Sequence, residues 1–152
     1  MYAPEPLNAL REMHRVLRPG GRAVASVWGR RDLCGWAEIF PIVDSRVQSE
    51  VCPMFFQLGT GENARHAMEA AGFGGVRVDR LNTLLHYESA EEACGAAFAG
   101  GPVALAYSRF DDGVRDEAHA EFVASIEPYR NANGYAIPGE FIIAAGTRPN
   151  QE

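Results

Sequence analysis

The sequence predicts an α/β fold with about three strands. A helix over 6–17 stops at Pro19-Gly20-Gly21 and leads at once into an apolar strand over 22–28, which is half of an α/β crossover. Along the chain, the predicted elements follow the order helix, strand, helices, strand, helices, strand. No internal repeat or linker divides them, so we expect the 152 residues to form a single domain, 1–152.

The composition is that of a globular protein and excludes some classes of partner. Apolar residues make up 47% of the chain and charged residues 22%. The formal net charge of -6 gives no basic footprint for nucleic acid, and anionic membranes would repel an acidic surface. No apolar run approaches the roughly 20 residues that span a bilayer, and the first residues do not resemble a signal peptide. The sequence therefore predicts a cytoplasmic protein without nucleic-acid or membrane partners.

Local sequence signals predict each element in the first half of the chain. Between 6 and 17 the apolar residues recur at three- and four-residue steps, which is one face of an amphipathic helix, and Pro6 suits its start. The strand over 22–28 shows almost no polar alternation, so we expect an interior strand covered on both faces. The polar loop 29–32 follows at its carboxyl end, where open α/β sheets place their ligands.

Turn and cap residues set the elements that follow. We expect helical structure over 35–48 with a kink or restart at Pro41, and a loop around Cys52-Pro53. Thr60 is predicted to cap a helix over 61–71, which Gly72 would end. The alternation over 76–84 predicts a strand exposed on one face.

The second half is predicted to be mainly helical before a last strand. Ser89 followed by two glutamates opens a helix, and a second helical stretch covers 113–126. Asn133-Gly134 signals a turn, and 141–145 reads as a buried strand.

Three stretches carry a resemblance to a known family. The segment 10–22, LREMHRVLRPGGR, resembles the segment that follows the fourth strand in class I S-adenosylmethionine-dependent methyltransferases, especially the type 11, ubiquinone/menaquinone-biosynthesis-like group. The stretch 68–73, MEAAGF, with VRV at 76–78, is similar to that family's later helix and sixth strand, and PGEFI at 138–142 resembles the entry to its seventh. The resemblance implies the C-terminal half of a Rossmann-like methyltransferase sheet, with a helical cap inserted at approximately 88–130.

The resemblance also implies a function. The chain would be the acceptor-side portion of a small-molecule methyltransferase with S-adenosylmethionine as its cofactor. In that family the first half holds the cofactor, through a glycine-rich turn and an acidic residue, so we expect no cofactor-binding residues in 1–152 and no cofactor binding by this chain alone. No catalytic residue is predicted, because alignment of donor and acceptor supplies much of the rate of methyl transfer. The sequence does not select a methyl acceptor.

Six aromatic residues are the candidates for the acceptor pocket, because the corresponding regions of the family line that pocket and apolar sites bind through aromatic walls. They are Trp28, Trp36, Phe55, Phe56, Phe98 and Tyr107. The alternative is that these side chains are core residues that hold helices on a small sheet. The glycine-rich run 58–62 also has two interpretations, a fragment of a nucleotide loop or, as we favour, a capping turn.

No metal site or disulfide is predicted. The three cysteines share no close spacing, and the four histidines lack the i, i+4 spacing of a helical metal pair. His14 has cationic neighbours, which suggests a solvated helix face. The acid pairs at 91–92 and 111–112 are interpreted as solvated helix starts.

The strand over 22–28 also bears on partners. In the family it would be a middle strand, so in this chain one of its edges would lack a neighbour, and an unpaired apolar edge is prone to pair with another chain. We therefore expect a homodimer formed through this edge or through adjacent helices. A second function follows as an alternative, namely a non-catalytic dimeric module that binds a small apolar ligand or a protein.

Overall fold

The computed structural model describes residues 3–47 and 51–150, and side chains from 54 onward after the gap. The chain divides into two compact units, which are described separately. Unit 1 comprises Met1–Arg31, Pro53–Asn82 and Glu140–Glu152, and unit 2 comprises Asp32–Cys52 and Thr83–Gly139. The long strands β2 (Gly74–Tyr87) and β4 (Gly134–Thr147) contribute residues to both units.

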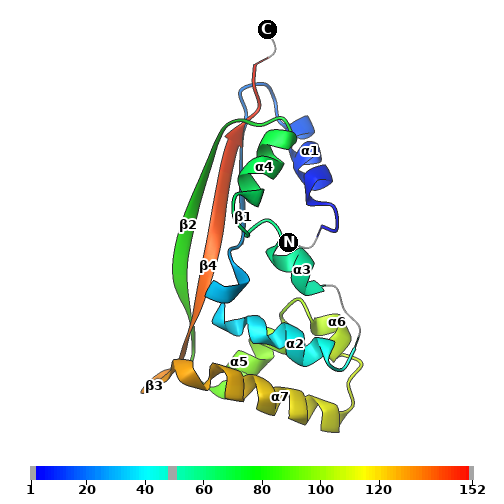
Figure 1. Cartoon of the computed structure of the whole chain (residues 1–152), viewed down its shortest axis with the longest axis vertical. Coiled ribbons are helices and arrows are strands. Elements are labelled where there is room, and N and C mark those ends of the chain that lie inside the picture. The colour runs from blue at the N-terminus through cyan, green and yellow to red at the C-terminus, as the bar shows by residue number, and fades with distance from the viewer. Residues whose placement is uncertain (1–2, 48–50, 151–152) are drawn as a thin grey trace. The chain divides into compact units, whose positions relative to one another are not determined.

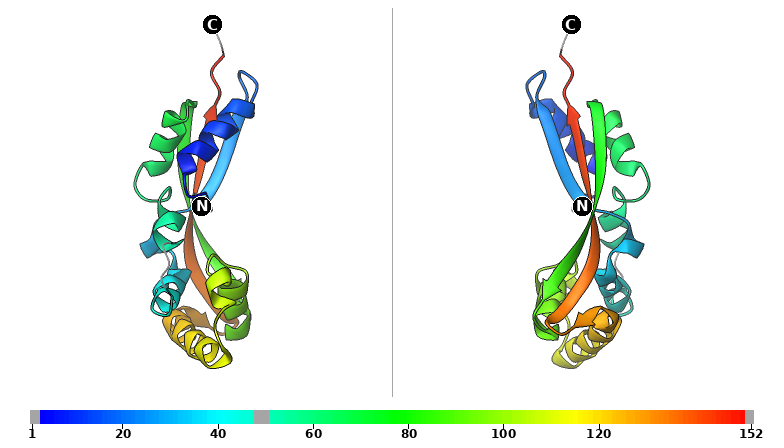
Figure 2. Two further views of the ribbon diagram at one scale, coloured as in Figure 1. Left: turned by 90° about the vertical axis from the view of Figure 1, so that its right-hand side faces the viewer. Right: turned by 90° about the vertical axis from the view of Figure 1, so that its left-hand side faces the viewer.

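The sheet has the order β1-β4-β2, so the last long strand of the chain lies between the two earlier ones (Figures 1 and 2). β1 (Arg22–Trp28) pairs antiparallel with β4, from Arg22 opposite Thr147 to Trp28 opposite Phe141. The short β3 (Arg130–Asn131) pairs antiparallel with the start of β4. The predicted α/β class is therefore confirmed, with three long strands and one short one in the described residues.

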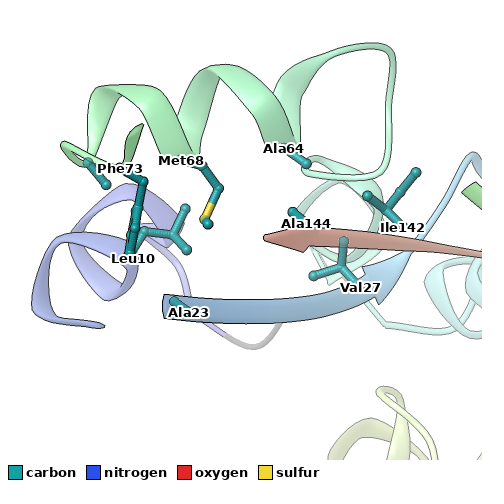
Figure 3. Packing of buried hydrophobic residues seen from close by; sticks show 9 residues of the cluster. Leu10, Ala23, Val27, Ala64, Met68, Phe73, Ile142 and Ala144 are labelled. Atoms are coloured by element: carbon teal, nitrogen blue, oxygen red, sulfur yellow. The ribbon is translucent and has the colours of Figure 1, made fainter. Parts of the chain in front are cut away.

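In unit 1, α1 (Pro6–Val16) and α4 (Asn63–Ala70) supply one side of the core, and β1 and β4 supply the other (Figure 3). Leu10, Met68 and Phe73 lie together at one end of this core, and Val27 and Ile142 of the strands lie farther along it (Figure 3). Gly72 has a φ of 98°, a left-handed conformation that favours glycine, and it ends α4 as predicted.

In unit 2, short helices pack around α7. These elements are η1 (Arg31–Leu33, whose first residue belongs to unit 1), η2 (Gly35–Glu38), α2 (Ile39–Asp44), α5 (Ala90–Cys94), η3 (Gly95–Ala99), α6 (Ala104–Tyr107), α7 (Asp112–Ile126) and η4 (Glu127–Tyr129). Ser89 and Asp111 cap α5 and α7, because their side chains accept hydrogen bonds from the backbone N–H of Glu92 and Val114. α7 buries Ala118, Phe122 and Ile126 on one face. The predicted helical segment 88–130 is thus helical for much of its length.

Three details of the sequence prediction are wrong. β1 is not covered on both faces, because the Val24 side chain is 57% exposed and Ser26 is exposed. The segment around Cys52-Pro53 is not a loop but part of α3 (Val51–Phe56), where proline occupies a first-turn position that needs no N–H partner. Thr60 does not cap α4, which begins at Asn63, because the Thr60 hydroxyl donates to the carbonyl oxygen of Phe56.

Candidate functional site

Glu140 is the one buried charged residue in the described part of the chain, with 3% of its surface exposed. It lies in β4 beside the segment that follows β1, and its Oε2 accepts a hydrogen bond from the backbone N–H of Arg30 at 2.8 Å. The Arg80 guanidinium, from β2, donates to the same oxygen at 2.9 Å. A buried carboxylate without such donors would be strongly destabilising, so the hydrogen bonds from Arg80 and the Arg30 amide compensate for the burial of Glu140 in unit 1.

Arg80 also contacts a second loop of unit 1. Its Nη2 donates to the carbonyl oxygens of Gly61 at 2.6 Å and of Gly59 at 3.3 Å. One guanidinium therefore ties the glycine-rich run 58–62 to the Glu140 carboxylate and, through it, to the segment after β1. We call Glu140, Arg80, Gly29, Arg30 and Gly59 the Glu140 cluster.

Two glycines of the Glu140 cluster permit this close approach. A Cβ on Gly29 would overlap the Glu140 carboxylate, and a Cβ on Gly59 would overlap the carbonyl oxygens of Trp28 and Gly29. The backbone is locked as well, because the Gly29 N–H donates to the Glu140 carbonyl oxygen at 2.7 Å. The cluster thus fixes the geometry of two loops at the carboxyl end of β1, the end at which the sequence predicts a ligand.

The run 58–62 does not have the arrangement of a nucleotide loop. A phosphate-binding loop points backbone N–H groups at its ligand, whereas Gly59 and Gly61 present carbonyl oxygens to Arg80 and the Gly59 N–H donates to Phe56. The run is a turn before α4, which agrees with the favoured interpretation, although without the predicted Thr60 cap.

In unit 1, three of the predicted acceptor residues occupy two different places. Trp28 is half-buried and stacks on Phe141 with ring centroids 4.1 Å apart. Phe55 and Phe56 are 3% and 4% exposed and meet edge to face at 5.6 Å.

In unit 2, Trp36 is buried against Phe40, with ring centroids 5.9 Å apart. Phe98 is buried and contacts the half-buried Tyr107, whose hydroxyl lies 3.0 Å from Nε2 of His119. The structure therefore pairs Phe98 with Tyr107 and Phe55 with Phe56, and most of the six candidates are core side chains. Their role in acceptor binding stays a prediction.

Two surface hollows of unit 2, of about 530 and 500 Å³, lie beside the β3–β4 turn. None of the six aromatic candidates lines either of them. The hollows share Glu88, Asn131, Ala132 and Tyr135. Burial, and then the charge of Glu92, raises the pKa of Tyr87 in the wall of the smaller hollow.

The histidines do not converge on one site. His66 and His86 are exposed. His14 does not lie on a solvated face, because its ring is half-buried and meets Phe73 edge-on at 5.1 Å. Within the described ranges, no group of three or more potential ligand side chains is arranged to hold a metal ion, and no helix has the length and apolar character needed to cross a membrane.

Comparison with known proteins adds one distant likeness. No protein-family profile matches the sequence, and no curated protein matches it. Among solved structures, a protein of Bacillus halodurans C-125 described as a "putative methyltransferase" is 14% identical to this chain, with a TM-score of 0.49. The alignment covers 97% of this chain and 64% of that one, so this chain spans less than two thirds of its length. A likeness of this size assigns neither a family nor an activity.

Proposed function

We propose that residues 1–152 are the C-terminal, acceptor-side portion of a class I, type 11 S-adenosylmethionine-dependent methyltransferase that acts on a small molecule in the cytoplasm. One observation carries the proposal. The three stretches that resemble this family lie at the α1–β1 junction, in α4 and the start of β2, and within β4. Residues of all three contribute to one hydrophobic cluster of unit 1.

The Glu140 cluster suits an acceptor-side role. Methyl transfer depends on alignment of the donor and acceptor atoms, so the walls of the acceptor site must be held rigidly. The cluster holds the loops that flank Trp28 with an ion pair and two close glycine contacts. The Glu140 carboxylate is engaged by its donors, so we assign it to positioning and not to proton transfer.

The glycine-rich run 58–62 does not suit S-adenosylmethionine. The carboxylate and ribose hydroxyls of that cofactor need backbone N–H donors and an acidic acceptor, whereas the run presents carbonyl oxygens to Arg80. We therefore propose that residues outside 1–152 supply the cofactor site, from a longer form of the gene product or from a partner chain.

Calorimetric titration tests the proposal. We expect no heat of binding when S-adenosylmethionine is titrated into residues 1–152, and micromolar binding by the longest in-frame product of the gene. Micromolar binding to 1–152 would overturn the assignment of the cofactor site to other residues. A reading frame without an upstream glycine-rich segment, together with failure to transfer a radiolabelled methyl group to any small molecule of a cell extract, would overturn the methyltransferase assignment.

A second candidate function is a homodimeric, non-catalytic module that binds a small apolar ligand. The observation that favours it is the edge position of β1, which has a partner strand on one side only in the described residues. If this function is right, neither the chain nor any longer product of its gene binds S-adenosylmethionine.

A further inference from the structure

The turn between β3 and β4 contains a dipeptide with a chemical reactivity of its own. Asn133 is followed by Gly134, and no other asparagine of the sequence precedes a glycine. The backbone nitrogen that follows an asparagine can attack its side-chain carboxamide, and this intramolecular attack is fastest before glycine, which has no Cβ to obstruct it. Such attack is one reason why asparagine is a thermolabile residue. The sequence therefore contains one pair of this reactive kind, and it lies in the β3–β4 turn.

The structure leaves the Asn133 carboxamide accessible. Asn133 is exposed, and its backbone N–H donates to Oδ1 of Asn131 at 2.8 Å. Its own carboxamide makes no hydrogen bond to another residue that the structure describes. β3 consists of two residues, so only two residue pairs with β4 constrain the turn (Figure 1). So short a pairing opens easily, and opening lets the Gly134 nitrogen reach the carboxamide.

The fold requires glycine at the second position of this dipeptide. Gly134 has a φ of 113°, a conformation that favours glycine. A Cβ at this position would also overlap the backbone carbonyl oxygens of Tyr87, at the end of β2, and of Glu88. A larger residue that slowed the attack would therefore strain the turn. The close approach of the start of β4 to the end of β2 thus fixes the residue that makes Asn133 reactive.

We propose that Asn133 is a site of spontaneous deamidation through a cyclic imide. The Gly134 backbone nitrogen loses its proton and bonds to Cγ of Asn133, and the Cγ–Nδ2 bond breaks, which releases ammonia. One water molecule then opens the ring. Cleavage at Cγ gives aspartate, and cleavage at the backbone carbonyl carbon gives isoaspartate, whose main chain is longer by one carbon. The sum consumes water and releases ammonia, without an oxidant or reductant. The inference is independent of both candidate functions, because it rests on the turn alone.

Both products change the smaller hollow of unit 2. Asn133 lines this hollow together with Glu88 and Glu92, so a carboxylate at position 133 adds to the negative charge of its wall. Isoaspartate also lengthens the main chain between β3 and β4, whereas aspartate does not. Because turn length fixes the register of a hairpin, we expect the isoaspartate form to lose the pairing of Arg130 with Tyr135.

Mass spectrometry of the aged, folded chain tests the site. The chain is incubated at mildly alkaline pH and then digested in acid, where the attack is slow. Asn131 is the matched internal control, because it is exposed in the same hairpin but precedes Ala132. We expect Asn133 to lose its amide at least tenfold faster than Asn131, and Asn133→Gln to keep its amide under the same conditions. Equal rates at the two asparagines, or loss at Asn133 only after unfolding in urea, would overturn the proposal.

Hydrogen exchange tests the consequence for the hairpin. The isoaspartate form, separated by chromatography, is compared with Asn133→Asp, which carries the same charge on an ordinary main chain. We expect the backbone amides of β3 and of Tyr135 to exchange at least tenfold faster in the isoaspartate form than in Asn133→Asp or the unaltered chain. Equal exchange in the three forms would overturn the expected loss of β3–β4 pairing.

Discussion

Arg80→Met should destabilise the chain far more than an ordinary surface substitution. The change removes the guanidinium and keeps an apolar stem of similar length. The Glu140 carboxylate, whose side chain is 5% exposed, then loses its ion-pair partner. Removal of one partner from a fully buried ion pair costs about 3–5 kcal/mol, whereas exposed pairs contribute about 0–1 kcal/mol. The Arg80 side chain is 33% exposed, so the free energy lost with its ion pair should lie between these limits.

The expected loss is about 3 kcal/mol in the free energy of unfolding, because the hydrogen bonds to Gly59 and Gly61 disappear as well. For a chain of this size that loss lowers the melting temperature by roughly 6–12 °C. Urea unfolding followed by circular dichroism measures the free energy. Arg77→Met is the matched control, because Arg77 lies on the same strand and pairs with Asp79 through side chains that are 75% and 55% exposed.

The double variant Arg80→Met with Glu140→Gln separates charge from packing. Glutamine keeps the acceptor for the Arg30 N–H and removes the buried charge, so the double variant should be more stable than Arg80→Met alone. The reasoning fails if Arg80→Met costs no more than Arg77→Met, or if Glu140→Gln restores no stability in the Arg80→Met background.

Three further predictions concern single contacts. Gly59→Ala should cost at least about 2 kcal/mol in urea unfolding, because its Cβ would overlap backbone atoms that cannot move aside easily. Asp111→Ala should cost about 1 kcal/mol through the lost cap of α7, while Asp111→Asn keeps most of that stability in the same assay. Burial raises the pKa of the Cys94 thiol to about 11, so folding favours its protonated form. This contribution is complete below the unfolded pKa of about 8.5 and disappears as the pH rises through about 11, so the urea midpoint should fall over that range less in Cys94→Ala than in the unaltered chain.

Local signals made much of the fold predictable. Periodicity and Pro19-Gly20-Gly21 predict α1 and β1 almost to the residue, and the Asn133-Gly134 turn is present between β3 and β4. The length of β4 was not predictable, because Pro138 and Gly139 lie inside a continuous strand and interrupt its apolar pattern. The exposed face of β1 was missed for a related reason. The outward-facing residues of β1 include the apolar Val24, so its sequence does not show the apolar–polar alternation that would indicate one exposed face.

The Glu140 cluster could be located only in part from the sequence. Glu140 is the single charged residue of a 14-residue strand, and that contrast is a signal of a buried, paired carboxylate. Its partner Arg80 lies 60 residues away, and no local pattern distinguishes Arg80 from the exposed Arg77. Gly59 does not have a left-handed φ that would distinguish it. Glycine is required there because a Cβ would overlap the backbone of Trp28.

Trp28 offers a test of the second candidate function. Its ring is half-buried and stacks on Phe141 with centroids 4.1 Å apart, at the carboxyl end of β1. If two copies pair through the β1 edge, Trp28 becomes less accessible as the protein concentration rises. In a Trp36→Phe background, acrylamide quenching of the remaining indole should therefore weaken across the dimerisation range, whereas in a Trp28→Phe chain the buried Trp36 should be quenched equally at all concentrations. Quenching of Trp28 that does not depend on concentration would count against a homodimer formed through β1.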